Sequence, residues 1–150
     1  MYENEKLLEE LNDLKLINSE RIEKYKKELE KTKDSEYISL FKGMIRGSML
    51  YKEELVHEMK RKEPGQGSKK LWRTGNIYKT WTDSIPSAGK NIFEMSEIIE
   101  LATQKAYESA LSSDIYIPSH IASLIIMHKA KFKESYQLLL KKQNLILENS

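Results

Sequence analysis

The sequence predicts an all-α protein in which four long helices form two hairpins joined by a long connection. Apolar residues recur at helical spacing along four stretches of the chain, the pattern of amphipathic helices. A short break at 33–35 separates the first two stretches, whereas the run from Glu63 to Ser68 stops the second and the third does not begin until Asn91. The 150 residues include no cysteine, so we expect one domain over 1–150 held by its core without disulfides.

The first helix is expected over about 3–33 and the second over 35–62. Asp34 or Ser35 is placed to cap the second helix, and so short a turn makes the two helices antiparallel neighbours. The inward row of the first helix combines apolar and polar residues: Leu7, Leu11, Leu14, Asn18, Arg21, Ile22, Tyr25 and Leu29. That of the second helix is Phe41, Met44, Ile45, Ser48, Leu55 and Met59.

Two glycines, Gly43 and Gly47, lie on the flank of the second helix's apolar row. Each costs about 1 kcal/mol against alanine in a helix interior. A close approach by another backbone, either from the connection or from a second subunit, would explain them. The alternative is that both are merely tolerated.

The connection over 63–90 is too long to lack structure in a compact domain, and a short helix around 69–83 is expected. Leu71, Trp72, Tyr78 and Trp81 give it apolar anchors. The third helix, about 91–113, opens on an Asn91 to Glu94 capping box, and the fourth, 119–147, begins after Pro118. The inward rows are Ile92, Met95, Ile99, Ala102, Ala106 and Ala110, then Ile121, Leu124, His128, Phe132, Ser135, Leu139 and Ile146.

This connectivity is that of ferritin-like bundles, and several segments resemble one family of them. Leu11 to Leu14 and Arg21 to Tyr25 are similar to the opening helix of the uncharacterised bacterial ferritin-like family named domain of unknown function 2383. The similarity continues through Phe41, Ser48, Glu54, Leu55, Glu100 and Lys105 to Glu108, and the aromatic connection with Leu71, Trp72 and Trp81 fits as well. The resemblance implies a ferritin-like four-helix bundle and brings no established activity.

A di-iron site is the chemistry to test in such a bundle, because ferritin-like metalloproteins use carboxylates and two Glu-x-x-His motifs. One motif is present at Glu54 and His57, Glu100 or Glu97 could supply a further carboxylate, and His128 would complete the set. The second motif fails, however, since Ile125 stands where its glutamate should be. The metal candidates are therefore Glu54, His57, Glu100 and His128.

The phase of the helices argues against this site. At 100° per residue Glu20, Glu23 and Glu54 fall away from the apolar rows, and His57 lies nearly opposite Phe41. In place of carboxylates the inward rows carry Asn18, Arg21, Ser48, Lys52, Thr103 and His128. Inward cations oppose a di-metal centre, so we expect no cofactor, with iron as the one to test, and interpret His128 as a hydrogen-bonded core residue.

The leading functional hypothesis is a non-enzymatic, homo-oligomeric scaffold or stress-associated protein, with Gly43, Gly47, Trp72 and Trp81 as candidate partner-binding residues. One alternative is a di-iron or peroxide-handling protein. Another is a binder of nucleic acid or an acidic partner through the basic residues Lys60, Arg61, Lys62, Lys69, Lys70, Arg73 and Lys79. The first residues do not resemble a signal peptide and no apolar run is long enough to span a membrane, so we expect a cytoplasmic protein without a membrane partner.

Overall fold

The computed structural model describes residues 2–62 and 73–148. Within these ranges all regular structure is helical, so the predicted all-α class is confirmed. The five helices are α1 (Tyr2–Glu30), α2 (Ser35–Lys62), α3 (Asn76–Ser84), α4 (Ile92–Leu111) and α5 (Ser119–Glu148). No helix in the described ranges combines the length and the apolar character needed to cross a membrane.

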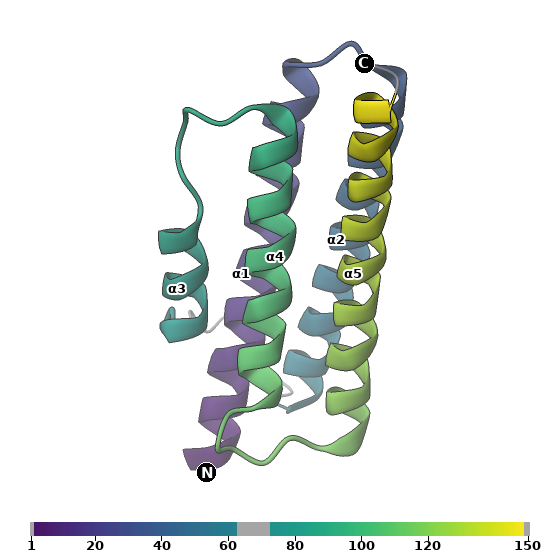
Figure 1. Ribbon diagram of the computed structural model, residues 1–150. Coiled ribbons are helices and arrows are strands. Elements are labelled where there is room, and N and C mark those ends of the chain that lie inside the picture. Colours follow the sequence, from purple (N-terminus) through teal and green to yellow (C-terminus); the bar gives the residue numbers. More distant parts are fainter. Residues whose placement is uncertain (1, 63–72, 149–150) are drawn as a thin grey trace.

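Four of the helices are long and lie side by side, as Figure 1 shows. In that view α1 and α5 run upward, whereas α2 and α4 run downward. Helix α1 contacts α2 and α4, and α5 contacts α4 and α2, so each long helix packs against antiparallel neighbours. The short helix α3 lies outside this layer against α1 and α4.

Local capping fixes where α2 and α4 begin. The Asp34 carboxylate accepts the backbone N–H groups of Glu36 at 2.9 Å and Tyr37 at 3.3 Å, so Asp34 is the cap. Because residue 34 must take a capping conformation, the chain leaves α1 at Glu30, before the predicted end at residue 33. The predicted capping box of α4 is confirmed, with Glu94 N–H donating to Asn91 at 2.8 Å and Asn91 N–H to the Glu94 carboxylate at 3.2 Å.

Helix α4 ends at Leu111, two residues before the predicted end. The hydroxyl of Ser112 donates to the carbonyl of Glu108 at 2.9 Å, and that of Ser113 to the carbonyl of Ala110, also at 2.9 Å. The backbone N–H of Ser112 also donates to the Glu108 carbonyl, at 3.0 Å, so Ser112 closes the last turn of the helix.

Helix α3 begins later than the sequence predicts. Residues 73–75 are not helical, and 69–72 lie outside the described residues. The buried Asp13 of α1 decides this boundary, because its carboxylate accepts the backbone N–H of Gly75 at 2.8 Å and of Tyr78 at 3.1 Å. A side chain from another helix therefore caps α3. A Cβ atom on Gly75 would lie 2.8 Å from the Asp13 carboxylate, so glycine is needed for this approach.

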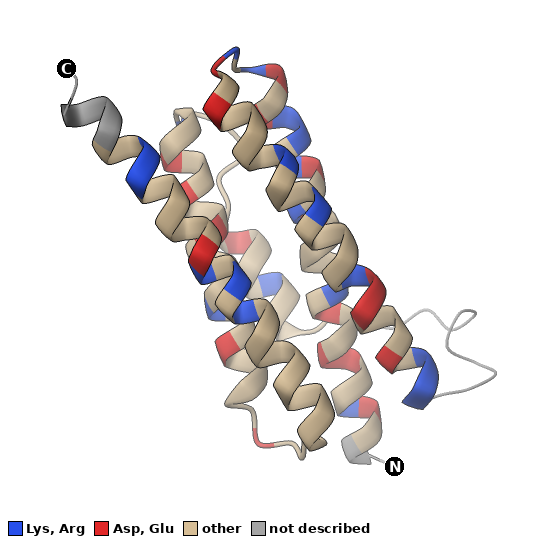
Figure 2. Ribbon diagram, turned by 90° about the vertical axis from the view of Figure 1, so that its right-hand side faces the viewer, with Lys and Arg blue, Asp and Glu red and all other residues tan. Residues whose placement is uncertain are grey.

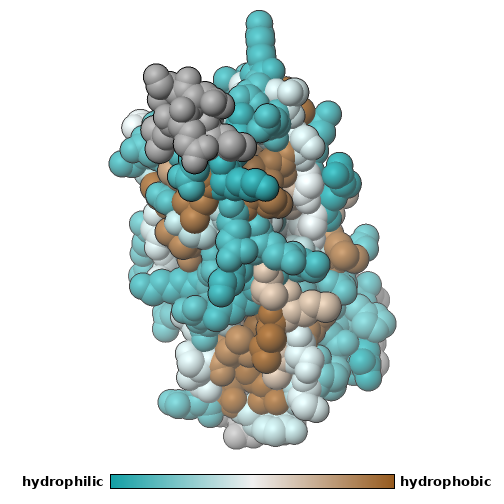
Figure 3. Space-filling view, turned by 45° about the vertical axis from the view of Figure 1, so that its right-hand side comes forward, coloured by the Kyte–Doolittle hydropathy of each residue, from teal (hydrophilic) through white to brown (hydrophobic). Residues whose placement is uncertain are grey.

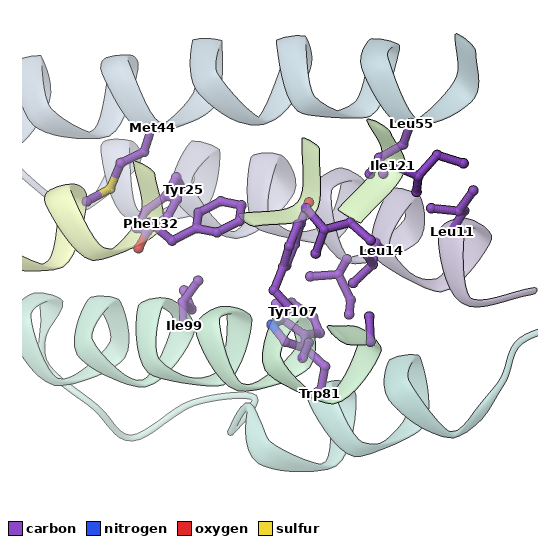
Figure 4. Packing of buried hydrophobic residues seen from close by; sticks show 14 of the residues in the cluster. Leu11, Leu14, Tyr25, Met44, Leu55, Trp81, Ile99, Tyr107, Ile121 and Phe132 are labelled. Atoms are coloured by element: carbon purple, nitrogen blue, oxygen red, sulfur yellow. The ribbon is translucent and has the colours of Figure 1, made fainter. Parts of the chain in front are cut away.

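The core lies between the four long helices and extends to α3. Figure 4 shows Tyr107 reaching from α4 into its centre and Trp81 extending inward from α3. The fully buried apolar side chains include Leu8, Leu11, Leu14, Ile17, Phe41, Leu55, Ile99, Ile121, Phe132 and Leu139. Seven residues of the predicted inward rows are only partly buried: Leu29, Ile45, Lys52, Ile92, Ala102, Leu124 and Ser135. The side chain of Ile146, also predicted to face inward, lies outside the described part.

Candidate functional site

The most strongly charged contact of the core joins Arg21 of α1 to Glu100 of α4, residues that are 1% and 0% exposed. Arg21 Nε donates to Glu100 Oε2 at 2.9 Å and Nη2 donates to Oε1 at 2.7 Å, a bidentate pair. The remaining nitrogen, Nη1, donates to the Met44 carbonyl at 2.9 Å and to Ser48 Oγ at 2.7 Å. All three guanidinium nitrogens are therefore satisfied by α2 and α4.

Aromatic side chains enclose this ion pair. The Tyr25 hydroxyl donates to Glu100 Oε2 at 2.6 Å, and burial together with the Glu100 charge raises the pKa of Tyr25 well above its usual value. The Arg21 guanidinium lies 4.8 Å from the ring centroid of Phe132 and 5.3 Å from that of Tyr25. Burial alone would lower the pKa of Arg21, but the Glu100 carboxylate outweighs it and holds the pKa above its ordinary value.

A line of polar contacts leads from Arg21 across the core. Ser48 Oγ donates to Asn18 Oδ1 at 2.9 Å, and Asn18 Nδ2 donates to the hydroxyl oxygen of Tyr107, also at 2.9 Å. The Tyr107 hydroxyl lies 3.0 Å from His128 Nδ1, and His128 Nε2 lies 2.9 Å from Glu54 Oε1. We call this series, which draws on all four long helices, the core hydrogen-bond chain: Arg21, Ser48, Asn18, Tyr107, His128 and Glu54.

The donors and acceptors of the core hydrogen-bond chain all point the same way. Asn18 Nδ2 also donates to the Leu14 carbonyl at 2.9 Å, and a carbonyl can only accept, so the orientation of the Asn18 amide is fixed. The Tyr107 oxygen accepts from Asn18, which leaves its own hydrogen for His128 Nδ1. The Glu54 carboxylate accepts from Nε2, so His128 is a neutral imidazole protonated at Nε2.

The two ends of the core hydrogen-bond chain differ in their access to solvent. His128 is 0% exposed, and its ring centroid lies 4.5 Å from that of Tyr51. The Glu54 side chain is 31% exposed at the seam between α2 and α5. Burial lowers the pKa of His128, although Glu54 pulls in the opposite direction. The core hydrogen-bond chain thus starts at a buried ion pair and ends at a carboxylate that water can reach.

The structure divides the four metal candidates among three places. Glu54 contacts His128, which corrects the prediction that Glu54 faces away from the bundle. Glu100 is fully buried, which corrects the prediction that the inward rows lack a carboxylate. His57 is exposed and lines a groove on the outside of α1 and α2, together with Lys52, which was predicted to face inward.

Among the described residues, no three or more histidine and carboxylate side chains are grouped as metal ligands would be. The other carboxylate considered, Glu97, accepts a hydrogen bond from the Tyr136 hydroxyl at 2.9 Å. Arg21 connects Glu100 to Ser48, and the uncharged side chains of Ser48, Asn18 and Tyr107 continue from there to His128 and Glu54. The sequence predicted Asn18, Arg21, Ser48 and His128 in the interior but gave no signal for the Tyr107 hydroxyl, which links Asn18 to His128.

The candidate partner-binding residues also lie in different settings. Trp81 is 2% exposed and its Nε1 donates to Thr103 Oγ1 at 3.0 Å, so its ring belongs to the core and is not offered to a partner. A Cβ on Gly47 would lie 3.2 Å from the Tyr51 hydroxyl, and one on Gly43 would meet only the end of Arg46 at 4.0 Å. In the described part of the chain, the expected close backbone approach is not found at either glycine. Trp72 lies outside the described residues.

The basic residues predicted to bind an acidic partner are exposed at Lys60, Arg61, Arg73 and Lys79, whereas Lys62 is partly buried. Lys60 and Arg61 lie near the end of α2, and Arg73 and Lys79 lie before and within α3. Arg61 is paired with Glu58 at 3.2 Å. Lys69 and Lys70 lie outside the described residues.

Comparisons of this chain with protein-family models, with curated proteins and with solved structures find no match. The roles of the core hydrogen-bond chain and of the surface are therefore inferred from the chemistry of their own residues.

Proposed function

We propose that this chain is a non-enzymatic ferritin-like bundle that works through its surface as a homo-oligomeric scaffold. Its core holds an ion pair between two of its own side chains where bundle metalloproteins place their metal ligands. The observation that carries the proposal is the bidentate contact of Arg21 with Glu100 at 2.7 and 2.9 Å.

The chemistry of Glu100 supports a core without a metal. Its two oxygens receive three donors, two from Arg21 and one from the Tyr25 hydroxyl. A carboxylate that ligates a divalent ion must direct a lone pair at that ion, and the guanidinium supplies the positive charge that a metal would bring. A second cation beside Arg21 would be repelled at low effective dielectric.

The arrangement of the long helices supports the ferritin-like assignment. The α1–α2 and α4–α5 hairpins lie side by side, and α2 and α4 run in the same direction (Figure 1). Two antiparallel hairpins related in this way require a connection that returns along the bundle, as in ferritin-like proteins. Helix α3 lies within the part of the chain that makes this connection.

Iron loading tests the metal-free core. We expect elemental analysis after aerobic and anaerobic incubation with ferrous iron to find no stoichiometric iron on the purified protein. Binding of about two iron atoms per chain, as in di-iron bundles, that is lost in Glu54→Ala or Glu100→Ala would refute the proposal and favour the di-iron alternative. The matched control is His57→Ala on the outer surface, because iron lost in that variant alone is surface-bound.

Exposed apolar side chains support self-association. Leu50 of α2 and Leu138 of α5 are 52% and 55% exposed, and Met49, Ile126 and Met127 are also exposed on these two helices. Hydrophobic side chains reach the surface in patches among hydrophilic ones in Figure 3. Removing such apolar surface from water favours association.

Light scattering across a concentration series tests the scaffold. We expect at least a dimer, and Leu138→Lys should weaken it because a charge would be buried in the contact. Leu101→Lys, on exposed Leu101 of α4, is the control that should leave the assembly unchanged. A wild-type chain that stays monomeric at high concentration would contradict the oligomeric part of the proposal.

A further inference from the structure

We propose that Tyr107, His128 and Glu54 form an acid-sensitive latch that holds α5 against α2 and loosens this seam when His128 takes a second proton. The latch lies in the core and does not depend on what the surface binds. His128 is the residue through which α5 joins the core hydrogen-bond chain, since its two ring nitrogens reach Tyr107 of α4 and Glu54 of α2.

The second proton has only one place to go. His128 Nε2 already donates to Glu54, so a further proton must be added at Nδ1, where the Tyr107 hydrogen points. The Tyr107 hydroxyl would then face two donors, Asn18 Nδ2 and His128 Nδ1. Within the described ranges no third group lies within hydrogen-bond distance of this hydroxyl to accept its displaced hydrogen. A buried hydroxyl left unpaired in this way weakens the structure.

The charged and titratable groups around His128 differ in the protonation state of the ring that they favour. From α2, Glu54 favours the imidazolium, and Tyr51 lies against the ring. From α4 comes Tyr107, and from α1 the guanidinium of Arg21, which acts on both tyrosines. On α5 itself, Glu134 interacts with Tyr51, and Lys129 is paired with Glu108 of α4 at 3.0 Å on the outer side.

Burial is the stronger influence on His128 and sets the sign of the pH dependence. Because the pKa of His128 in the folded chain lies below its ordinary value of 6.5, the unfolded chain binds the proton first. The stability contributed by neutral His128 is complete above about pH 6.5 and is lost as the pH falls toward the folded pKa.

The latch matters because few polar contacts join α5 to α2 and the turn before it. Helix α5 packs mainly on α4. Among the described residues, its polar side-chain contacts in this direction are Lys142 with Asp34 at 2.8 Å and with Glu36 at 3.5 Å, His128 with Glu54 at 2.9 Å, and His120 with Glu58 at 3.1 Å. Figure 2 shows these two helices diverging toward one end of the bundle. There a groove of about 570 Å³, lined by Leu40, Gly43 and Leu138 among others, separates them.

Other groups respond to acid with the opposite sign and must be separated from His128. Burial raises the pKa of Glu10 and of Asp13, so the folded chain binds protons more readily than the unfolded one at these residues. Their contribution to stability grows as the pH falls through their raised pKa values, which is the opposite sign to that of His128. A loss of stability between pH 6.5 and 5 therefore points to His128.

The test compares the wild type with His128→Gln, whose amide can accept from Tyr107 and donate to Glu54 but cannot take the second proton. Chelator-treated samples are unfolded with urea at pH values from 7.5 to 5.0. We expect the folded-to-unfolded ratio of the wild type to fall up to tenfold per pH unit below about pH 6.5. The ratio for His128→Gln should stay nearly constant, and hydrogen exchange should show amides of α5 and α2 near the latch losing protection only in the wild type.

Nuclear magnetic resonance of the imidazole nitrogens gives a second, residue-specific measurement. We expect His128 to report the Nε2–H tautomer and to titrate below its ordinary value of 6.5. Glu54→Gln should lower the pKa of His128 further, whereas Glu53→Gln, at an exposed neighbouring position, should leave it unchanged. The proposal fails if His128 titrates at or above its ordinary value of 6.5, or if His128→Gln keeps the wild-type pH dependence. If His128→Gln does not fold, the Glu54→Gln and Glu53→Gln comparison decides.

Discussion

The two carboxylates at opposite ends of the core polar contacts hold basic side chains in different ways. Glu100 meets a guanidinium that stays charged at any ordinary pH, and both partners are fully buried. Glu54 meets an imidazole that burial keeps neutral, and the carboxylate itself remains 31% exposed. A buried basic group can thus be held in two ways. A guanidinium stays charged and fully paired, whereas an imidazole stays neutral and makes one hydrogen bond at each ring nitrogen.

This difference separates a permanent contact from a responsive one. The Arg21 guanidinium needs four acceptors from two other helices, since a buried charge without partners is costly. Neutral His128 needs only one donor and one acceptor, so a single added proton can upset it. We therefore expect the Arg21 end to determine the stability of the bundle and the His128 end its response to pH.

The largest effect should come from removing the fixed charge. We expect Arg21→Met to lower the free energy of unfolding by about 3–5 kcal/mol, because it leaves Glu100 buried without its counter-charge. Urea denaturation at pH 7 measures this. The double variant Arg21→Met with Glu100→Met should recover much of the loss, and Lys26→Met, from an exposed pair with Glu23, should change stability by about 0.5 kcal/mol or less. An Arg21→Met protein as stable as the wild type would show that the ion pair is not the main polar contact.

The two carboxylates can be compared directly by converting each to its amide. Glu100→Gln should cost about 3 kcal/mol, because it leaves the Arg21 charge buried without a counter-ion. Glu54→Gln should cost about 1 kcal/mol or less at pH 7, since an amide oxygen can still accept from neutral His128. The free energies of unfolding of the two variants give the comparison, and equal values would contradict the distinction between the two ends.

The smallest expected difference lies between two tyrosine hydroxyls. Tyr25→Phe removes a bond to the ionised Glu100 and should cost about 1.5–3 kcal/mol, the range for hydrogen bonds to charged groups. Tyr107→Phe removes bonds between neutral partners and should cost about 0.5–1.5 kcal/mol. Thermal unfolding of both variants at pH 7 ranks them. The opposite order would mean that the Tyr107 hydrogen bonds between Asn18 and His128 contribute more than the Tyr25 hydrogen bond to the ion pair.

Much of the helical architecture could be predicted because its signals are local. The apolar rows and the 33–35 turn give the long helices, and the predicted helix over 35–62 coincides with α2. The Asn91 capping box depends on residues three apart and was read correctly. The start of α3 could not be read in this way, because its cap, Asp13, lies 62 residues before Gly75 in the chain.

The candidate site was predictable in some of its members but not in its pairing. Helical phase placed Arg21, Asn18, Ser48 and His128 inside. Helical phase gives the direction in which a side chain leaves its own helix, however, and does not say which other helix covers that side. Glu54 was assigned to the exterior, yet α5 lies against it, and Lys52 was assigned to the interior, yet it borders an outer groove. Contacts between helices decide these positions.

The capping of α3 by a distant carboxylate has a consequence for the order of assembly. A helix of nine residues is too short to persist alone in water, where about 12–15 residues are already marginal. Asp13 can cap it only once α1 exists, and Trp81 finds Thr103 only once α4 is in place. We therefore expect α3 to be the last helix to form during folding. In native-state hydrogen exchange it should be the first helix to lose protection, while α1 and α4 stay intact.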